Sequence, residues 1–453
     1  MLATAAGALL AVTAAVLTAP HAAQAAEAST GFHVSDGRLL DANGEDFVLR
    51  GVNHAHAWYT AKTPQALKDI KALGANSARV VLSTGDQWTR NDTADVAAIV
   101  EQCKASRLVC VLEAHDTTGY GEAGAAVPLT RAVDYWKGIK SAVEGQEKYI
   151  ILNLGNEPYG NTGYENWTSG TTDAIKSMRA AGFKHTIMVD APNWGQDWSF
   201  TMRDNAAGVF AADPDKNTVF SIHMYGVYDT AAEVQDYLNR FVSQKLPIVV
   251  GEFGDAHSDG NPDEDAIMAT AQQLGLGYMG WSWSGNGGGV EYLDMATGFD
   301  AGQLTTWGQR IFNGTNGIKA TAHEAGVYGS GGTGGGDGDG DGDGGTSTGA
   351  CQVTYKLSDW GSTFNADVTI RNTGTTAVKG WKLQFPFPGD QRVNSAWNAK
   401  VSQQGAAVTA THESWTETIP AGGSVSFGLN GSSASANSIP STFALNSASC
   451  TKA

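Results

Sequence analysis

The sequence has few charged residues and no excess of positive charge. Only 17% of its 453 residues are charged, and 29 Lys and Arg stand against 46 Asp and Glu, which gives a formal net charge of −17. Such an acidic chain is poorly suited to bind nucleic acid or an anionic membrane surface. Beyond the N-terminus, no apolar run is long enough to span a bilayer. We therefore expect neither nucleic acid nor a membrane as a partner. A neutral polysaccharide stays possible, because its binding does not depend on a complementary charge.

Cysteine is also scarce, and the four cysteines fall into two pairs. Cys103 and Cys110 lie close together, and Cys351 and Cys450 bracket the last segment. Residues 1–26 are rich in Ala, Leu and Val and end in the small-x-small pattern Ala23-Gln24-Ala25, although the usual early Lys or Arg is missing. We expect a secreted, extracellular protein in which both pairs form disulfides. The alternative for Cys103 and Cys110 is two small buried thiols.

The length of the chain exceeds that of one ordinary domain. Gly329–Gly349 consists almost entirely of Gly, Asp, Ser and Thr, which is the composition of a flexible linker. We predict a signal peptide at 1–26, a large domain at 27–328, a linker at 329–349 and a second domain at 350–453.

Short apolar segments alternate with helical patterns throughout the large domain. Pro64–Leu73 and Asp92–Lys104 are two of the helical patterns. Eight strands that alternate with helices predict an α/β fold, a (β/α)8 or TIM barrel. The expected strands lie near Phe47–Val52, Ser77–Leu82, Leu108–Glu113, Tyr149–Leu154, Thr186–Val189, Val219–Ile222, Pro247–Val250 and Gly277–Gly280.

Polar side chains lie at or near the carboxyl ends of six of these eight strands. Asn156 and Glu157 come directly after one buried strand, and Glu252 ends another. The carboxyl ends of barrel strands are where barrel enzymes carry their chemistry, and two carboxylates there are typical of a glycosidase. An isolated Arg or His has an ordinary structural explanation, but polar residues at six strand ends favour a site. The remaining residues of this set are Arg79, His115, His223, Tyr225 and Trp281.

Two motifs carry a resemblance to a known family. Asn156-Glu157-Pro158 and Gly251-Glu252-Phe253-Gly254 resemble glycoside hydrolase family 5, whose members are retaining enzymes built on this barrel. The order Arg, His, Asn-Glu, His-x-Tyr, Glu, Trp also matches. Gly51–Tyr59, Glu113–Gly121 and Trp281–Asn286 are similar to the bacterial endo-β-1,4-mannanases of the family rather than to its cellulases. Spacing alone reveals no preference for mannose.

The resemblance implies a role for each residue of the catalytic domain. Glu157 is the expected acid and base, and Glu252 the expected nucleophile. Asn156 is expected to bind the sugar 2-hydroxyl, and Trp281 to form the floor of the sugar site. The expected substrate-binding residues are Arg79, His115, Asn156, His223, Tyr225, Trp281 and Trp194, with Trp58 and Trp283 as further candidates. None of these steps requires a cofactor or a metal.

Acidic residues crowd the loop that follows the seventh strand. Hard oxygen ligands in one loop can hold Ca²⁺, although the spacing is not that of an EF-hand. We keep a structural calcium site as a hypothesis, with a solvated acidic loop as the alternative. The four ligands would be Asp259, Asp263, Glu264 and Asp265.

The segment after the linker has the alternating pattern of an all-β sandwich. It resembles the family 2 carbohydrate-binding modules through its terminal cysteines, Gly380-Trp381-Lys382-Leu383 and Trp397-Asn398. The resemblance implies a flat cellulose-binding strip of Trp360, Trp397 and Trp415. Trp381 lies inside an apolar alternation and is expected in the core.

Three functions compete at this point. The first is a secreted, monomeric endo-β-mannanase that acts on β-mannan polysaccharides and binds a cellulose surface. The second is an endo-β-1,4-glucanase of the same family. The third is a polysaccharide-binding protein without catalytic activity, which the two intact glutamates and their partners disfavour.

Overall fold

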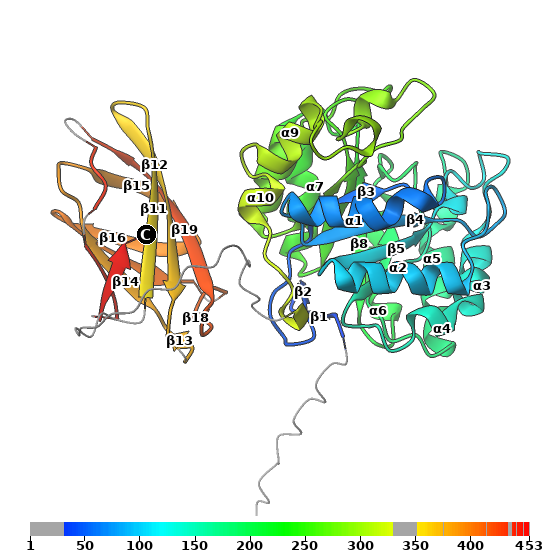
Figure 1. Ribbon diagram of the computed structural model, residues 1–453, viewed down its shortest axis with the longest axis horizontal. Coiled ribbons are helices and arrows are strands. Elements are labelled where there is room, and N and C mark those ends of the chain that lie inside the picture. The colour runs from blue at the N-terminus through cyan, green and yellow to red at the C-terminus, as the bar shows by residue number, and fades with distance from the viewer. Residues whose placement is uncertain are drawn as a thin grey trace, which may run out of the picture. The chain divides into compact units, whose positions relative to one another are not determined.

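The computed structural model describes residues 31–328 and 351–452, apart from residues 375, 414, 434–436, 441 and 447. The chain divides into two compact units, Met1–Gly331 and Gly332–Ala453 (Figure 1). The predicted signal peptide at 1–26 and the predicted linker at 329–349 lie outside the described residues and stay predictions. Among the described residues, no helix combines the length and the apolar character that crossing a membrane would require.

The first unit is a closed barrel of eight parallel strands, in the order β10-β3-β4-β5-β6-β7-β8-β9. Each strand overlaps one of the eight segments that the sequence predicted, so the predicted barrel is confirmed. The strands are β3 (Arg50–His54), β4 (Ser77–Leu82), β5 (Val109–Ala114), β6 (Ile150–Asn153), β7 (Ile187–Asp190), β8 (Thr218–Met224), β9 (Ile248–Phe253) and β10 (Gly277–Gly280).

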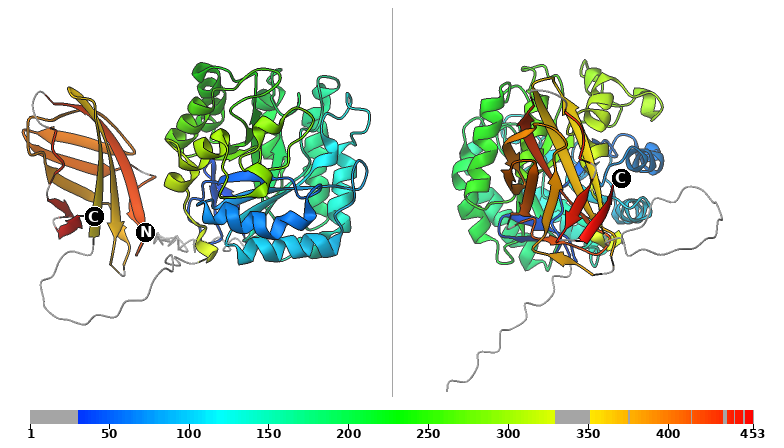
Figure 2. Two further views of the ribbon diagram at one scale, coloured as in Figure 1. Left: turned by 45° about the horizontal axis from the view of Figure 1, so that its top comes forward. Right: turned by 90° about the vertical axis from the view of Figure 1, so that its left-hand side faces the viewer.

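Helices surround this barrel (Figure 2). Several begin at a side-chain cap, as where the Asp92 carboxylate accepts from Ala94 N and Asp95 N at the start of α2. The helices are α1 (Thr63–Ala72), α2 (Thr93–Ala105), α3 (Leu129–Gly138), α4 (Lys140–Val143), α5 (Trp167–Ala180), α6 (Thr201–Ala212), α7 (Ala231–Ser243), α8 (Glu264–Leu274), α9 (Thr306–Asn313) and α10 (Ile318–Thr321). Short 3-10 turns lie at Thr60–Lys62, His115–Thr117, Tyr164–Asn166, Glu291–Leu293, Thr297–Phe299 and Gly326–Tyr328.

The alternation of side chains along each strand separates two cores. Cys110 and Leu112 of β5 pack with the helices, whereas Val109 and Val111 join the cluster inside the barrel. Phe47 and other residues near the β1–β2 hairpin (His33–Ser35 and Arg38–Leu40) complete this interior cluster. Every second residue of a strand faces the interior of the barrel. The same faces that are apolar deep in the barrel therefore turn polar at the carboxyl ends of the strands.

A disulfide joins the end of α2 to β5. Cys103 and Cys110 are both fully buried and form one bridge, which confirms the bonded alternative rather than two free thiols.

The second unit is a β structure whose main sheet folds over on itself. Nine strands follow the order β15-β19-β12-β11-β21-β20-β14-β17-β16, and β13 pairs with β18 separately. The two outermost strands of this order are consecutive in sequence, with only Asn398 between them, so the ends of the sheet must meet. The strands are β11 (Cys351–Asp359), β12 (Thr363–Asn372), β13 (Val378–Lys379), β14 (Lys382–Pro386), β15 (Arg392–Trp397), β16 (Ala399–Gln404), β17 (Ala407–His412), β18 (Thr418–Ile419), β19 (Ser424–Ser432), β20 (Phe443–Leu445) and β21 (Ala448–Lys452).

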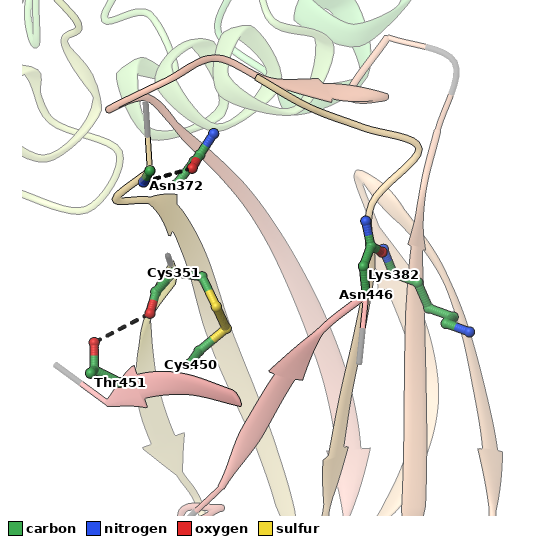
Figure 3. Close-up of a disulfide and its surroundings, with 7 residues drawn as sticks. Cys351, Asn372, Lys382, Asn446, Cys450 and Thr451 are labelled. Atoms are coloured by element: carbon green, nitrogen blue, oxygen red, sulfur yellow. Dashed lines mark hydrogen bonds between the residues drawn. A yellow bond between two sulfur atoms is a disulfide. The ribbon is translucent and has the colours of Figure 1, made fainter. Parts of the chain in front are cut away.

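The predicted disulfide between Cys351 and Cys450 ties the first strand of this unit to the last (Figure 3). The two strands also pair in parallel, with Gln352 opposite Thr451. The Thr451 hydroxyl donates to the carbonyl of Cys351 at 3.3 Å. Trp381 is fully buried in the core of the unit, as the sequence predicted, and stacks on Phe427.

Candidate active site

The interior polar positions at the carboxyl ends of the strands meet around Arg79 of β4. Its side chain is fully buried and makes five hydrogen bonds to side chains, at 2.6–3.0 Å. Each nitrogen of the guanidinium has at least one partner, so the orientation of the group is fixed. We call this set the Arg79 network; the partners are Asn53, Asn153, Asn156, Asp190 and Glu252.

Glu252, at the end of β9, is held from two sides. Arg79 donates to its Oε1 at 2.6 Å, and the Tyr225 hydroxyl donates to its Oε2 at 3.0 Å. Burial raises the pKa of the Glu252 carboxyl above its usual value, and the positive charges of His223 and Arg79 oppose this rise. These two cations and the Tyr225 hydroxyl therefore favour the ionised carboxylate in a place where burial alone would keep it neutral.

Glu157 follows β6 in a backbone conformation that aims its side chain into the same space. Its φ is 40°, in the left-handed region that a non-glycine residue rarely adopts. His223 Nδ1 lies 2.8 Å from Glu157 Oε1 and 3.7 Å from Glu252 Oε2. Burial would lower the pKa of His223, but the negative charges of Glu252 and Asp190 raise it to about 10. The imidazole is therefore a cation between the two carboxyl groups.

The separation of the two carboxyl groups decides which displacement they can support. Glu157, His223 and Glu252 each offer one atom, and these atoms all lie within 4.8 Å of one another. A retaining glycosidase holds its carboxyl groups about 5–5.5 Å apart, whereas an inverting enzyme needs about 6.5–9.5 Å for a water. The geometry thus fits direct attack by one carboxylate.

Among the described residues, these same three side chains are close enough together to act as ligands of a metal ion. A histidine must be neutral to ligate a metal. Because the pKa of His223 is raised to about 10, its imidazole is protonated near neutrality and suits an ion pair better than a metal site.

An aromatic group borders the carboxyl pair. The His115 ring stacks on Trp281, with centroids 5.8 Å apart and an angle of 22°. Trp58 meets the His115 ring edge-on at 5.3 Å, and Trp88 lies at 5.7 Å from it. Glu113 accepts from His115 Nδ1 at 2.8 Å, and although burial lowers the pKa of His115, this carboxylate raises it overall. The three tryptophan rings are partly exposed, whereas His115 is buried, so Trp58, Trp88 and Trp281 are the rings that can offer apolar faces to a sugar.

Several residues of the site were missed by sequence reasoning. Asp190, at the end of β7, accepts from Arg79 at 3.0 Å and from Asn153 at 2.9 Å. The sequence does contain a pattern that could have identified Asp190, because this residue ends an apolar strand just before Ala191-Pro192. Glu113 shows the same pattern, because it lies at the end of the apolar strand β5. Trp88 shows no such pattern, because its role arises from contacts with Trp58 and His115, which are distant in sequence.

The tryptophans predicted for neighbouring subsites differ in their surroundings. Trp283 is fully buried and packs edge-on against Phe312, so its assignment as a subsite residue is wrong; it belongs to the core. Trp194 is half-buried, and its indole N–H donates to Glu122 at 3.0 Å. Asn156 accepts from Arg79 and donates to the Thr118 hydroxyl at 2.9 Å, which leaves one amide hydrogen for a sugar hydroxyl.

Three of the four predicted calcium ligands have other partners. Asp263 caps α8 by accepting from Ala266 N, and Asp265 pairs with Arg310. Asp259 accepts from Gln196 Nε2 at 2.8 Å and from Gly226 N at 3.2 Å. Within the described residues, neither these three nor Glu264 belong to a cluster of metal-ligating groups. The calcium hypothesis stays a prediction that the contacts do not support.

The three tryptophans predicted to bind cellulose are exposed in the second unit. Trp360 is 63% exposed, Trp397 39% and Trp415 67%, whereas Trp381 is fully buried. The module therefore leaves two indoles largely in water and a third partly so, and these surfaces are available for stacking.

A TIM barrel that holds two carboxyl groups at this separation fits the class of retaining glycoside hydrolases. The family described as Cellulase (glycosyl hydrolase family 5) matches residues 40–287, and the family described as Cellulose binding domain matches residues 351–450. The chain belongs to glycosyl hydrolase family 5 and carries a C-terminal module of the cellulose-binding family.

Individual relatives agree with this assignment. A mannan endo-1,4-β-mannosidase of Streptomyces lividans is 64% identical over 317 residues, which cover 70% of this chain and 82% of the relative. The solved β-mannanase from Thermomonospora fusca is 58% identical, with a TM-score of 0.65, and the match covers 66% of this chain and 99% of that one. For the module, exoglucanase B of Cellulomonas fimi is 46% identical over 103 residues, 23% of this chain and 9% of the relative.

Proposed function

We propose that this protein hydrolyses internal β-1,4-mannosidic bonds of mannan, glucomannan or galactomannan by a retaining double displacement. The observation that carries the reaction type is the pair of carboxyl groups of Glu157 and Glu252, with oxygens within 4.8 Å. The choice of mannan is supported by the similarity to a mannan endo-1,4-β-mannosidase and to a solved β-mannanase. The N-terminal pattern at residues 1–26 supports secretion of the protein, and we propose that it acts as a monomer.

The first displacement uses both glutamates at once. A carboxylate oxygen of Glu252 attacks the anomeric carbon while Glu157 gives its proton to the glycosidic oxygen. The bond to the leaving sugar breaks, and a glycosyl ester forms on Glu252. Arg79 and Tyr225 keep the attacking carboxylate ionised and oriented, at 2.6 and 3.0 Å.

The second displacement reverses these roles. Glu157, now ionised, takes a proton from a water molecule, and the water oxygen attacks the anomeric carbon. The carboxylate of Glu252 leaves. Two inversions at one carbon give a product with the configuration of the substrate.

The module adds a second activity in this proposal, which is adsorption to cellulose through Trp360, Trp397 and Trp415. Because cellulose and mannan lie together in plant material, adsorption would hold the barrel near its substrate. A variant that ends near residue 329 should keep its rate on soluble mannan and lose adsorption to insoluble cellulose.

A reducing-sugar assay on mannan, glucomannan and carboxymethyl-cellulose separates the competing functions. The proposal predicts activity on the first two and little on the third. Activity mainly on carboxymethyl-cellulose would favour the endoglucanase alternative. Adsorption without any release of reducing sugar would favour a non-catalytic binding protein.

A further inference from the structure

A loop of the barrel unit, residues 191–200, carries two tryptophans outside the Arg79 network. It follows β7 and lies beside the segment that bears Glu157. Trp194 N donates to the carbonyl of Tyr159 at 3.3 Å, two residues after Glu157. The Trp194 ring also lies against Gly119, whose own N–H donates to the carbonyl of Glu157 at 3.0 Å. The loop therefore flanks the proposed acid.

Trp198 lies on the same loop and contacts the same segment farther from the acid. Its indole N–H donates to the Asn161 side chain at 2.7 Å, four residues after Glu157. Its ring meets Tyr164 edge-on at 5.6 Å and 60°. Even so, 46% of Trp198 is exposed. The hydrogen bond and the edge contact hold this ring in place, and a large part of its surface still faces water.

The exposure of Trp198 does not come from a loosely held loop. The preceding residue, Asp197, is fully buried. Its carboxylate accepts from the Tyr237 hydroxyl at 2.6 Å and from the backbone N–H groups of Met202 and Arg203 at 2.9 Å. The exposed part of the Trp198 ring contributes no hydrophobic stabilisation to the fold, because it stays in water. The loop therefore holds a large, rigid aromatic face in a position where a ligand can stack on it.

Phe200 on the same loop provides an internal comparison. It is 39% exposed, close to the value of Trp198. The guanidinium of Arg203, however, lies 3.6 Å from the centroid of the Phe200 ring and covers one face. Trp198 has no such cation among the contacts of the described residues. Of the two exposed rings, Trp198 is the one suited to stack on a sugar.

We propose that Trp198 forms an outer subsite for the leaving-group part of the polysaccharide. The inference rests on the proposed function. Glu157 protonates the oxygen that departs, so the leaving part of the chain must pass along the side of the barrel where Glu157 lies. Trp194 borders that path near the acid, and Trp198 stands farther along it. The ring would stack on the apolar face of a mannosyl unit at some distance from the cleaved bond.

The cleavage pattern of reducing-end-labelled mannohexaose tests this subsite. In Trp198→Ala, the label should move to shorter leaving fragments, because binding modes with a long leaving group lose their outer contact. Transfer of mannosyl units to added mannotriose, which must occupy the same subsites, should fall by about three- to tenfold, the effect of one lost aromatic contact. Phe200→Ala is the matched control and should leave both readouts unchanged. Trp198→Phe should restore most of the pattern, because an aromatic face remains.

Two results would overturn the inference. One is a product pattern and a transfer rate in Trp198→Ala that equal those of Phe200→Ala. The other is an equal loss of rate for mannohexaose and mannotriose in Trp198→Ala, with unchanged products and no rescue by Trp198→Phe, which would indicate a structural role. Failure of the wild type to cleave mannohexaose would refute the proposed function itself and is distinguishable from both.

Discussion

In the barrel, the side chains that carry the proposed chemistry lie inside the structure, and in the module those proposed to bind cellulose lie outside it. Arg79 and Glu252 are fully or almost fully buried, at 0% and 4% exposure, whereas Trp360 and Trp415 are 63% and 67% exposed. Arg79 is held by five side-chain partners. Cleavage of a glycosidic bond needs charged side chains whose positions are fixed by neighbouring groups. It also needs a site without bulk water, because water would screen these charges. Adsorption to a flat polymer needs apolar faces that nothing else covers.

Because the groups in the barrel site are buried and hydrogen-bonded, we expect the largest loss of activity from Arg79→Lys. One ammonium group cannot replace the five hydrogen bonds of the guanidinium, and several buried acceptors lose their donor. We expect kcat on mannan to fall by about 10³-fold. The acidic limb of the pH profile should also move upward, because Arg79 lowers the pKa of Glu252. Arg131→Lys, at an exposed ion pair with Asp86, is the control. A fall of less than tenfold in Arg79→Lys would contradict the importance of the network.

The two disulfides should differ in what they contribute to stability. Cys351 and Cys450 are 99 residues apart, and Cys103 and Cys110 only 7. The conformational entropy that a bridge removes from the unfolded chain grows with the logarithm of the length of the closed loop. Replacing Cys351 and Cys450 by Ser should therefore cost the module about 4–5 kcal/mol of its free energy of unfolding. The same change at Cys103 and Cys110 should cost the barrel about 2–3 kcal/mol. Denaturant unfolding of each unit measures both, and equal losses would contradict the loop-length explanation.

Within the module, a buried and an exposed tryptophan should respond differently. Trp381→Ala removes a fully buried ring and should lower the free energy of unfolding of the module by about 3–5 kcal/mol. Trp415→Ala should leave the unfolding transition nearly unchanged and weaken adsorption to cellulose instead. Calorimetry and a depletion assay on both variants separate the effects. A destabilised Trp415→Ala, or normal folding of Trp381→Ala, would reverse the assignment of core and binding face.

The last expected effect is a pH dependence of the stability of the barrel. The pKa of His223 rises from 6.5 to about 10 on folding, because of the negative charges of Glu252 and Asp190. The protonated form is thus favoured in the folded state, so its contribution is complete below the unfolded pKa and is lost as pH rises toward 10. His223→Gln should lack this alkaline loss. Melting curves of the barrel in both proteins, recorded across this interval, should diverge; parallel curves would show that His223 is not a buried cation.

The sequence was sufficient where structure follows from local pattern. Buried apolar runs bounded by Gly and Pro predicted all eight barrel strands, and their position after such runs predicted Glu157 and Glu252. The alternation around Trp381 predicted its burial. Each of these follows from the period of a strand, which a sequence displays directly.

Prediction failed where a role depends on contacts between distant residues. Asp190 gains its importance from Arg79, 111 positions away in sequence. Trp283 was predicted to line the sugar site, but its ring is buried in the core. The segment after β10 contains two tryptophans, and the sequence does not reveal which of them is buried. The sequence also did not reveal that Asp263, one of the four proposed calcium ligands, caps α8, which is a common role of an Asp just before a helix. The calcium hypothesis itself stays a prediction.

Treatment of two alanine variants with azide tests the assignment of the two glutamates most directly. In Glu157→Ala, a substrate with a good leaving group still glycosylates Glu252, and azide attacks the intermediate, so the product should be a β-mannosyl azide after two inversions. In Glu252→Ala, no ester forms, and azide replaces the missing carboxylate in a single inversion, so an α-mannosyl azide should result. NMR of each product gives the anomeric configuration. The opposite pairing of product and variant would exchange the two roles, and net inversion by the wild type would contradict the retaining mechanism altogether.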